Sequence, residues 1–463
     1  MTFIACRSEQ GLQLKKRFIN TLTVMSGLKY YNMNRILLFF FSAVIVFSSC
    51  KKNDDTVFDQ TPDERINAAL AKYQAALTGS ATGWNATVRT GTGGVYHFYF
   101  RFNESNRVFM YADLDLESAS TLAESSYRLK ALQQPSLIFD TYSYLHVLAD
   151  PNGDVNGGQN GQGLVSDFEF SIDSLVADSI KLTGRLHNTK VTLVKATQQD
   201  LDDWQNGKWA NTLSFGNINK ILNYFRRINI GGKDYEVRVN LVTRIITFTW
   251  VNASGNTEQF STEFDYNAGG LVFSTAFTAG TETVTGLDIV SWDNSNLKLN
   301  VKVNGVDATI SGFTQPLKVD LTAPTRWWQY AEQQTGGWTS LNGFHVNGVD
   351  DAFGINSLPN YLVMFYFPNF GSGYDWGGII DNNGDGIYGP ALGPTFTGDG
   401  RITFVSPGNF GTIPGYASAK MTQIRNQYLN ASGYYLVQTG PTSYDMVVAS
   451  DAKAWITWDG IIH

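Results

Sequence analysis

Short segments in which apolar and polar residues alternate recur along the chain, and they constrain its fold more than any other feature. In Val95–Phe102 every second residue is aromatic, while His97 and Arg101 occupy positions between them. Successive side chains of a strand point to opposite faces, so the aromatic residues share one face. The same alternation recurs at 168–172 and 246–250. It predicts antiparallel strands with one buried and one wet face.

The composition of the chain excludes several other classes of protein. Charged residues make up 16% of the chain, against about 25% in typical domains, which excludes long charged helices and coiled coils. Hydrophobic residues make up 43%, so most of the chain is not disordered. Two cysteines exclude a disulfide scaffold and a Cys-rich metal module. The net charge of −7 argues against a nucleic-acid partner.

Three helix signals divide the chain, and each precedes a block of strands. Thr61 and Pro62 are an N-cap and a first helical residue, a helical patch follows at 201–225, and a third start lies at 322–325. We therefore predict a mainly β fold with a few short helices, built from tandem antiparallel β-sheet modules that are sandwiches or open barrels. The predicted modules are residues 62–200, 201–321 and 322–463, and the last holds six of the eleven tryptophans.

A weak internal echo links the first two modules. The spacing from Leu137–Phe139 to Ile180–Leu182 exceeds the spacing from Leu271–Phe273 to Leu297–Leu299 by the length of 150–166. That segment is rich in Gly and Asn and has no strand pattern. It is interpreted as a loop inserted into the first module, and loops on a rigid scaffold often carry function.

The amino-terminal region predicts export. The apolar run Ile36–Phe47 follows Arg35 and ends at Ser48-Ser49-Cys50. It is too short to span a bilayer, which needs about 20 residues, but it has the parts of a secretory signal peptide. Small serines before Cys50 are typical of bacterial lipoproteins, so we expect lipid on Cys50. The alternative is an interior apolar helix that ends at a cysteine by chance.

The segments around the predicted cleavage site complete this interpretation. Residues 1–32 fit no signal region and Met33 is an ordinary start, so 1–49 are interpreted as an over-called start plus signal peptide. Residues 50–61 form a polar tether. Its acidic pair Asp54-Asp55 is similar to the tag that sends lipoproteins to the outer face of the outer membrane, and ordinary linker composition is the alternative. Loss of 1–49 removes six basic residues and one acid, which makes the mature chain more acidic.

Five segments of the first module are distinctive, namely Ser126–Leu129, Pro135–Tyr142, His146, Asp150–Asn152 and Ser166–Phe170. Together with the lipoprotein signal, they resemble a family of Bacteroidetes lipoproteins known as domain of unknown function 4302. The resemblance is strongest over about residues 50–200. It implies an accessory lipoprotein near an uptake system in which a TonB-dependent porin works with a substrate-capturing lipoprotein. It implies no catalytic residue.

Catalytic motifs are weakly represented in this sequence. The five histidines have no zinc-helix spacing, and neither a Gly-x-Ser-x-Gly elbow nor a phosphate-binding Gly-Lys loop occurs. A glycoside hydrolase needs only two carboxylates. The last module offers Asp350, Asp351, Asp375 and Asp399, although no pattern places two of them across a cleft.

Calcium is the one cofactor that the sequence suggests. Asp381, Asn383 and Asp385 stand at positions 1, 3 and 5 of an EF-hand-like loop, with Gly386 at position 6. Position 12 is Leu392 rather than the bidentate glutamate, so this is half a motif. The alternative is a tight turn, which Asp, Asn and Gly also favour.

Aromatic platforms are the remaining ligand candidates. Trp376 and Tyr374 lie in the glycine-rich stretch 371–378, which predicts an exposed setting outside a strand. Flat aromatic faces can bind the apolar faces of sugars. The competing interpretation places most tryptophans of this module in its core.

Taken together, these patterns predict a lipid-anchored protein of the outer membrane, exposed at the cell surface. We expect a non-catalytic binding or accessory component of a TonB-linked uptake system for a glycan or a peptide. Two alternatives stay open. One is a surface hydrolase that uses loop carboxylates of the last module, and the other is a structural or adhesive surface protein.

Overall fold

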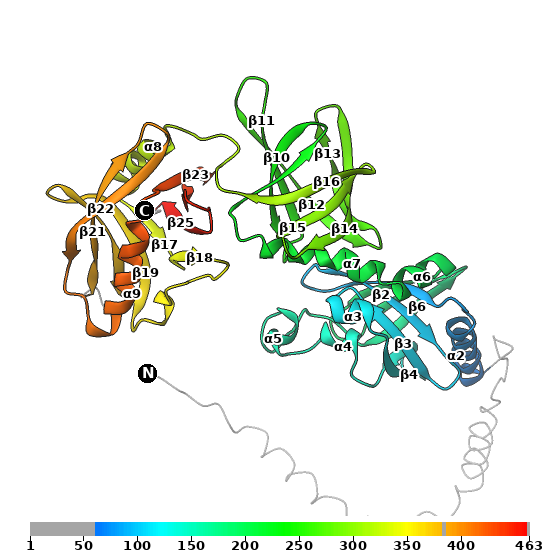
Figure 1. Ribbon diagram of the computed structural model, residues 1–463. Helices are drawn as coiled ribbons and strands as arrows, with labels where there is room; N and C mark the ends of the chain where they lie inside the picture. The colour runs from blue at the N-terminus through cyan, green and yellow to red at the C-terminus, as the bar shows by residue number, and fades with distance from the viewer. Residues whose placement is uncertain (1–60, 382–385, 461–463) are drawn as a thin grey trace, which may run out of the picture. The chain divides into compact units, whose positions relative to one another are not determined.

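The computed structural model describes residues 61–381 and 386–460. Its strands form two closed eight-stranded barrels and one nine-stranded sheet, and every strand pairing is antiparallel (Figure 1). Residues 66–381 and 386–460 belong to one compact unit. The predicted mainly β fold with tandem antiparallel modules is confirmed, and the first two sheets close into barrels.

The first barrel is formed by β1–β8, and β1 closes the ring by pairing with both β2 and β8. The aromatic face predicted in β2 is the barrel interior, where Phe98 and Phe100 are buried. The elements are α2 (Pro62–Thr78), β1 (Trp84–Arg89), β2 (Val95–Phe102), β3 (Arg107–Ala112), α3 (Leu116–Ser120), β4 (Ala123–Ala131), β5 (Pro135–Phe139), α4 (Tyr144–Val147), α5 (Gly153–Asn156), β6 (Glu169–Val176), β7 (Ser179–Gly184) and β8 (Lys190–Lys195).

The second barrel is formed by β9–β16, and β9 closes it by pairing with β10 and β16. Phe215 and Ile218, in the turn of 3-10 helix before β9, pack into its core. The elements are α6 (Gln198–Gln205), α7 (Lys208–Leu213), η1 (Ser214–Lys220), β9 (Phe225–Ile230), β10 (Lys233–Asn240), β11 (Ile245–Val251), β12 (Thr257–Asn267), β13 (Gly270–Ala279), β14 (Glu282–Asp293), β15 (Lys298–Val303) and β16 (Val306–Phe313).

The internal echo marks equivalent strands of the two barrels. Its segments lie on β5 and β7 of the first barrel and include residues of β13 and β15, the fifth and seventh strands of the second. Only Gly280 and Thr281 join β13 to β14, whereas 140–168 join β5 to β6 and contain α4 and α5. The first barrel therefore carries a long connection where the second has a tight turn.

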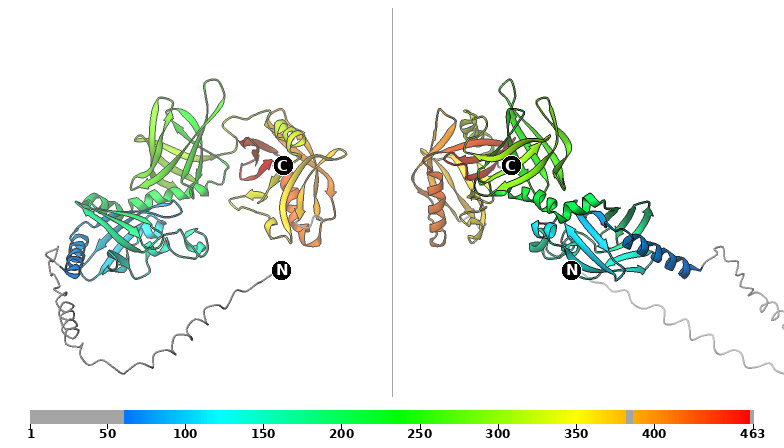
Figure 2. Two further views of the ribbon diagram at one scale, coloured as in Figure 1. Left: turned by 180° about the vertical axis from the view of Figure 1, so that it is seen from behind. Right: turned by 45° about the vertical axis from the view of Figure 1, so that its right-hand side comes forward.

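The third sheet also returns on itself, because β25 pairs with β18 near its start and with β17 at its end. Helix α9, orange in Figure 2, packs against β21 and β22 and was not predicted. The elements are α8 (Ala323–Tyr330), η2 (Ala331–Thr335), β17 (Trp338–Ser340), β18 (Phe344–Val346), η3 (Ile355–Ser357), β19 (Tyr361–Gly371), β20 (Tyr374–Asp381), β21 (Ile387–Phe396), β22 (Arg401–Phe410), η4 (Gly415–Ala417), α9 (Ser418–Tyr428), β23 (Tyr434–Gly440), β24 (Ser443–Val448) and β25 (Ala454–Gly460).

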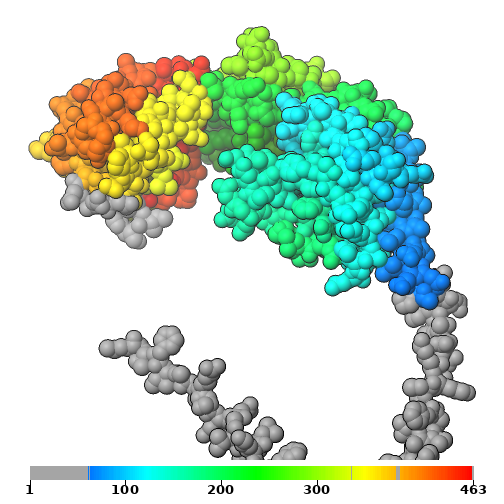
Figure 3. Space-filling model, turned by 90° about the horizontal axis from the view of Figure 1, so that it is seen from below, coloured from blue at the N-terminus to red at the C-terminus, as the bar shows by residue number. Residues whose placement is uncertain are grey.

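Helix α2 lies at the surface, where it is blue in Figure 3. Near its end Leu77 is buried in the core of the first barrel, and Leu77 O accepts a hydrogen bond from Trp84 Nε1 at 3.0 Å. Within 61–381 and 386–460, no helix combines the length and apolar character needed to cross a membrane.

A buried carboxylate organises the loop between β7 and β8. Asp167 is 4% exposed, and its oxygens accept hydrogen bonds from the main-chain N–H groups of Leu186 (2.8 Å), His187 (3.0 Å) and Thr189 (3.1 Å). A Cβ at Gly184 would lie 1.9 Å from Asp167 Oδ2, so only glycine leaves room for the carboxylate. The Ser166–Phe170 segment thus has a structural task in this barrel.

Asp167→Ala is expected to destabilise the first barrel by about 3 kcal/mol, because it leaves three main-chain donors without their acceptor. Denaturant unfolding followed by tryptophan fluorescence measures the change. Asp173→Ala is the matched control, since Asp173 is exposed and accepts one side-chain hydrogen bond, from Thr183. Equal losses in both variants would contradict the role given to Asp167.

Candidate functional site

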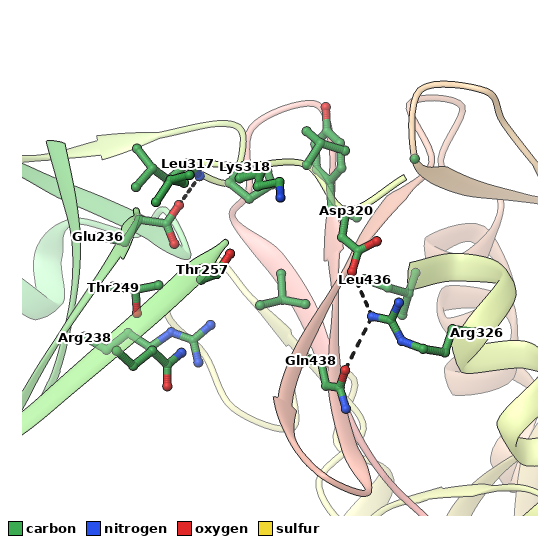
Figure 4. A pocket seen from close by; sticks show the side chains of 17 residues that line it. Glu236, Arg238, Thr249, Thr257, Leu317, Lys318, Asp320, Arg326, Leu436 and Gln438 are labelled. Carbon is green, nitrogen blue, oxygen red and sulfur yellow. Dashed lines mark hydrogen bonds and ion pairs between the residues drawn. The ribbon is translucent and has the colours of Figure 1, made fainter. Parts of the chain in front are cut away.

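A pocket of about 240 Å³ lies between the outer face of the second barrel and strand β23 (Figure 4). One wall consists of residues from β10, β11 and β12. The other consists of the linker Pro316–Asp320, Arg326 from α8, and Tyr435–Gln438 from β23. We call this space the junction pocket.

The barrel wall is polar because it is the solvent side of alternating strands. Val237 and Phe248 point into the barrel core, so their neighbours point outward. Glu236, Thr249 and Gln259 form one row across the three strands, since each lies opposite the next in register. Among the described residues, the side chains of Thr249 and Gln259 have no hydrogen-bond partner, which leaves one hydroxyl and one amide available to a ligand.

The charged groups of this wall are already paired. Arg227 Nη2 lies 3.5 Å from Glu236 Oε1, and the N–H of Leu317 also donates to Glu236. Burial raises the pKa of Glu236 above its ordinary value despite these partners. Arg238, which extends toward the pocket in Figure 4, donates to the Tyr224 hydroxyl, and that hydroxyl donates to Asp445. The pocket is therefore polar without a strong net charge.

The opposite wall is held by a second ion pair. Arg326 Nη2 donates to Asp320 Oδ2 at 2.8 Å and to Gln438 Oε1 at 3.4 Å, which ties α8 to the linker and to β23. Apolar side chains of Val319 and Val437 complete this wall. Sequence reasoning missed the junction pocket. Alternation predicts that Glu236 faces outward, but no local sequence pattern predicts that it lies across a pocket from β23, about two hundred residues later in the chain.

A second hollow, of about 280 Å³, lies on the third sheet. The His345 ring stacks on Trp455 with centroids 3.7 Å apart, and His345 Nδ1 donates to Asp350 Oδ1 at 2.5 Å. Asp459 also lines the hollow, and burial together with the negative charge of Asp445 raises its pKa. His345 Nε2 makes no hydrogen bond to a hydroxyl of the described residues, so no side-chain hydroxyl there is paired with this histidine.

The expectation that Trp376 is exposed outside a strand is wrong. Trp376 is fully buried on β20, and its ring stacks on Phe367 with centroids 5.4 Å apart. The flanking glycines have another cause than a loop. A Cβ at Gly378 would lie 2.4 Å from Trp376 Nε1, and one at Gly377 would lie 2.9 Å from the Tyr428 hydroxyl. The glycines make room for large neighbours, and a buried indole presents no platform to a sugar.

Some of the other predicted site residues lie outside the residues that the structure describes. Tyr374 is half-buried at the first position of β20, and its ligand role stays a prediction. Asp381 ends β20, and its Oδ1 accepts a hydrogen bond from the N–H of Gly386 at 3.2 Å. Asn383, Asp385 and Cys50 lie outside the described residues, so calcium binding and lipid attachment also stay predictions. Within 61–381 and 386–460, no three His, Cys, Asp or Glu side chains are grouped to hold a metal ion.

The four loop carboxylates proposed for hydrolysis do not converge. Asp350 and Asp351 line the hollow beside His345, but the Asp351 carboxylate accepts hydrogen bonds from the N–H groups of Ile355 and Asn356. Asp399 is held at the surface by Arg401.

Asp375 is 2% exposed and accepts hydrogen bonds from Trp328 Nε1 at 2.7 Å, from the Tyr366 hydroxyl and from the Asn369 N–H. These contacts hold α8 to β19 and β20, which is a structural task.

The pH dependence of stability separates Asp375 from Asp399. Burial raises the pKa of Asp375, so the folded protein binds this proton more tightly than the unfolded chain does. The stability difference between the parent protein and Asp375→Asn should therefore fall as pH rises from about 3 through the raised pKa. Urea unfolding at successive pH values measures it.

Asp399→Asn is the matched comparison with the opposite sign. The hydrogen bond from Arg401 lowers the pKa of Asp399 to about 2, so its stabilising contribution should be present above pH 4 and disappear as pH falls toward 2. Parallel pH curves for the two variants would contradict the assignment.

Comparison with solved structures gives no usable likeness. A beta clamp from H. pylori in complex with 5-chloroisatin matches at 9% identity, with 86% of this chain and 98% of that chain covered, at a TM-score of 0.14. A C. crescentus beta sliding clamp with bound PEG matches at 8% identity, with 86% and 97% covered, at a TM-score of 0.14. No curated protein matches its sequence.

A family model does match, and it bears out the resemblance seen in the sequence. The model covers residues 54–294, which is more than half of the chain. The matched segment contains the whole first barrel and ends just after β14 of the second, so β15, β16 and the third sheet lie beyond it. The chain belongs to the family described as domain of unknown function 4302 (DUF4302).

Proposed function

We propose that this protein is a lipid-anchored lipoprotein of the cell envelope that binds a ligand without transforming it. In this proposal it serves as an accessory subunit of a nutrient-uptake system, beside a TonB-dependent porin and a substrate-capturing lipoprotein. The observation that carries the proposal is the apolar run Ile36–Phe47 followed by Ser48-Ser49-Cys50, which has the parts of a lipoprotein signal.

The junction pocket supports the binding part of the proposal. Among the described residues that line it, the side chains of Thr249, Thr257 and Gln259 have no hydrogen-bond partner. Its charged groups Glu236, Arg238, Asp320 and Arg326 are all held by protein groups. Such groups orient a ligand by hydrogen bonds but supply neither a general base nor a nucleophile. Family membership adds no activity, because the family is itself one of unknown function.

A surface hydrolase remains the second candidate, and the hollow around His345 is the observation that favours it. It places a histidine with a carboxylate partner in the same hollow as Asp459, whose pKa is raised by burial and by the charge of Asp445. An acid and a base of this kind are the minimum for hydrolysis. Turnover of a glycan or peptide panel that His345→Ala abolishes would favour the enzyme over the binding protein.

Lipid attachment is tested by Cys50→Ser in the full chain expressed in a bacterium that processes lipoproteins. The parent protein should fractionate with membranes and incorporate an alkyne analogue of palmitate, because the thiol of Cys50 would carry the lipid. The variant should lose the label and keep the larger mass of the uncleaved chain. Equal labelling of both proteins would contradict the proposal.

Association with the uptake system is measured separately, by affinity purification of the lipidated protein from detergent-solubilised envelopes. We expect a co-purifying outer-membrane porin. Cys50→Ser is the control variant, since it is expected to lose the lipid that holds the protein at the membrane. Labelling and purification of the lipoprotein without a porin would leave a structural or adhesive surface protein as the better account.

A further inference from the structure

Strand β23 has an open edge. It pairs with β24 from Tyr434 to Gly440, but with β22 only at Tyr434 and Tyr435. Strand β22 begins at Arg401, opposite Tyr435, so residues 436–440 extend past its first residue and have a strand partner on one side only. An edge of this kind presents main-chain donors and acceptors that can pair with another chain.

The register shows which main-chain groups lie on the open side. The N–H of Ala449 donates to Gly433 O at 2.9 Å, so Gly433 and Ala449 form a hydrogen-bonded pair with β24. In antiparallel strands such pairs alternate with pairs whose N–H and C=O groups point away from each other. By this alternation, the N–H and C=O groups of Leu436 and Gln438 point away from β24 and toward the open edge.

The open edge faces the junction pocket. Alternate residues of a strand point to opposite faces, yet the four consecutive residues Tyr435–Gln438 all line the pocket. They do so because the pocket meets the edge of the strand rather than one of its faces. The linker Pro316–Asp320 lines the pocket in the same way. Among the described residues, no main-chain hydrogen bond joins this linker to β23.

We propose that the junction pocket binds an extended peptide, which pairs with the open edge of β23 as an added strand. Leu436 and Gln438 each contribute one N–H and one C=O, which matches the spacing of alternate residues in an extended peptide. Thr249 and Gln259 on the barrel wall then meet polar side chains of the peptide. This inference rests on the proposed binding function and names its ligand class.

The lining favours a peptide over a glycan. Sugar sites present an exposed aromatic face, but no tryptophan lines the junction pocket, and Tyr435 is only 8% exposed. The available groups are main-chain amides in a regular row, which complement another main chain. Protein groups already pair with the charged side chains of the pocket, which are Glu236, Arg238, Asp320 and Arg326. The peptide therefore needs no particular charge.

The test compares Gln438→Pro with Gln438→Ala in the full-length protein. Proline removes the N–H on the open side and leaves the ladder to β24 intact, while alanine removes the side chain and keeps that N–H. An array of random decapeptides supplies the tightest binder, which is resynthesised with fluorescein for anisotropy titration. Both variants lose the contact of Gln438 Oε1 with Arg326, and only proline also loses the N–H. We therefore expect Gln438→Pro to bind about tenfold more weakly than Gln438→Ala.

A second measurement uses the parent protein alone, so it does not depend on the folding of a variant. N-methylation of the decapeptide at successive residues should weaken binding at every second position within the bound stretch, because only alternate N–H groups face β23. Uniform effects along the peptide, or equal affinity of the two Gln438 variants, would overturn strand addition.

The outcomes separate this inference from the proposed function. Binding of an oligosaccharide panel, with no decapeptide bound, would overturn the peptide inference and leave the binding function standing. If lipidated protein that co-purifies with a porin binds neither the decapeptides nor the oligosaccharides, the peptide inference and the binding role are both overturned.

Discussion

Hydrogen bonding along the edges of β-sheets is the constraint on which the rest of this structure depends. An open sheet leaves two rows of unpaired N–H and C=O groups, which invite aggregation. The first two modules remove both rows by pairing their first and last strands, and the third pairs β25 with β17. Closure fixes an inside and an outside for every strand. The buried aromatic faces, the polar outer rows and the pocket between them all follow from it.

Closure is complete in the first two modules and incomplete in the third. The third ring contains the short contact between β22 and β23, where two residue pairs carry the whole junction. Strand β22 begins at Arg401, opposite Tyr435, so residues 436–440 of β23 extend past its first residue. The open edge is thus produced by strands of different extent at this end of the sheet. Helix α9 follows the other end of β22 and packs into the core with Met421, Ile424 and Tyr428.

The sequence predicts the strands and the order of the modules far better than it predicts their partners. Alternation in Val95–Phe102 reports which residues are buried, since burial of one face is a local property of a strand. The pairing of β1 with β8 is not local and leaves no local pattern. Trp376 shows the same limit. Its glycine neighbours indicate a turn when taken alone, and only the cross-strand rings reveal a packed strand. The junction pocket joins two modules, so its residues carry no common motif.

The family match ends after β14, inside the closed second barrel. A ring of strands has no natural stopping point within it, because removal of β15 and β16 would expose the edges of β14 and β9 at once. The matched segment that ends after β14 is therefore a unit of sequence similarity and not a folding unit. The connection between β5 and β6 is long and the one between β13 and β14 is a tight turn, yet both rings close.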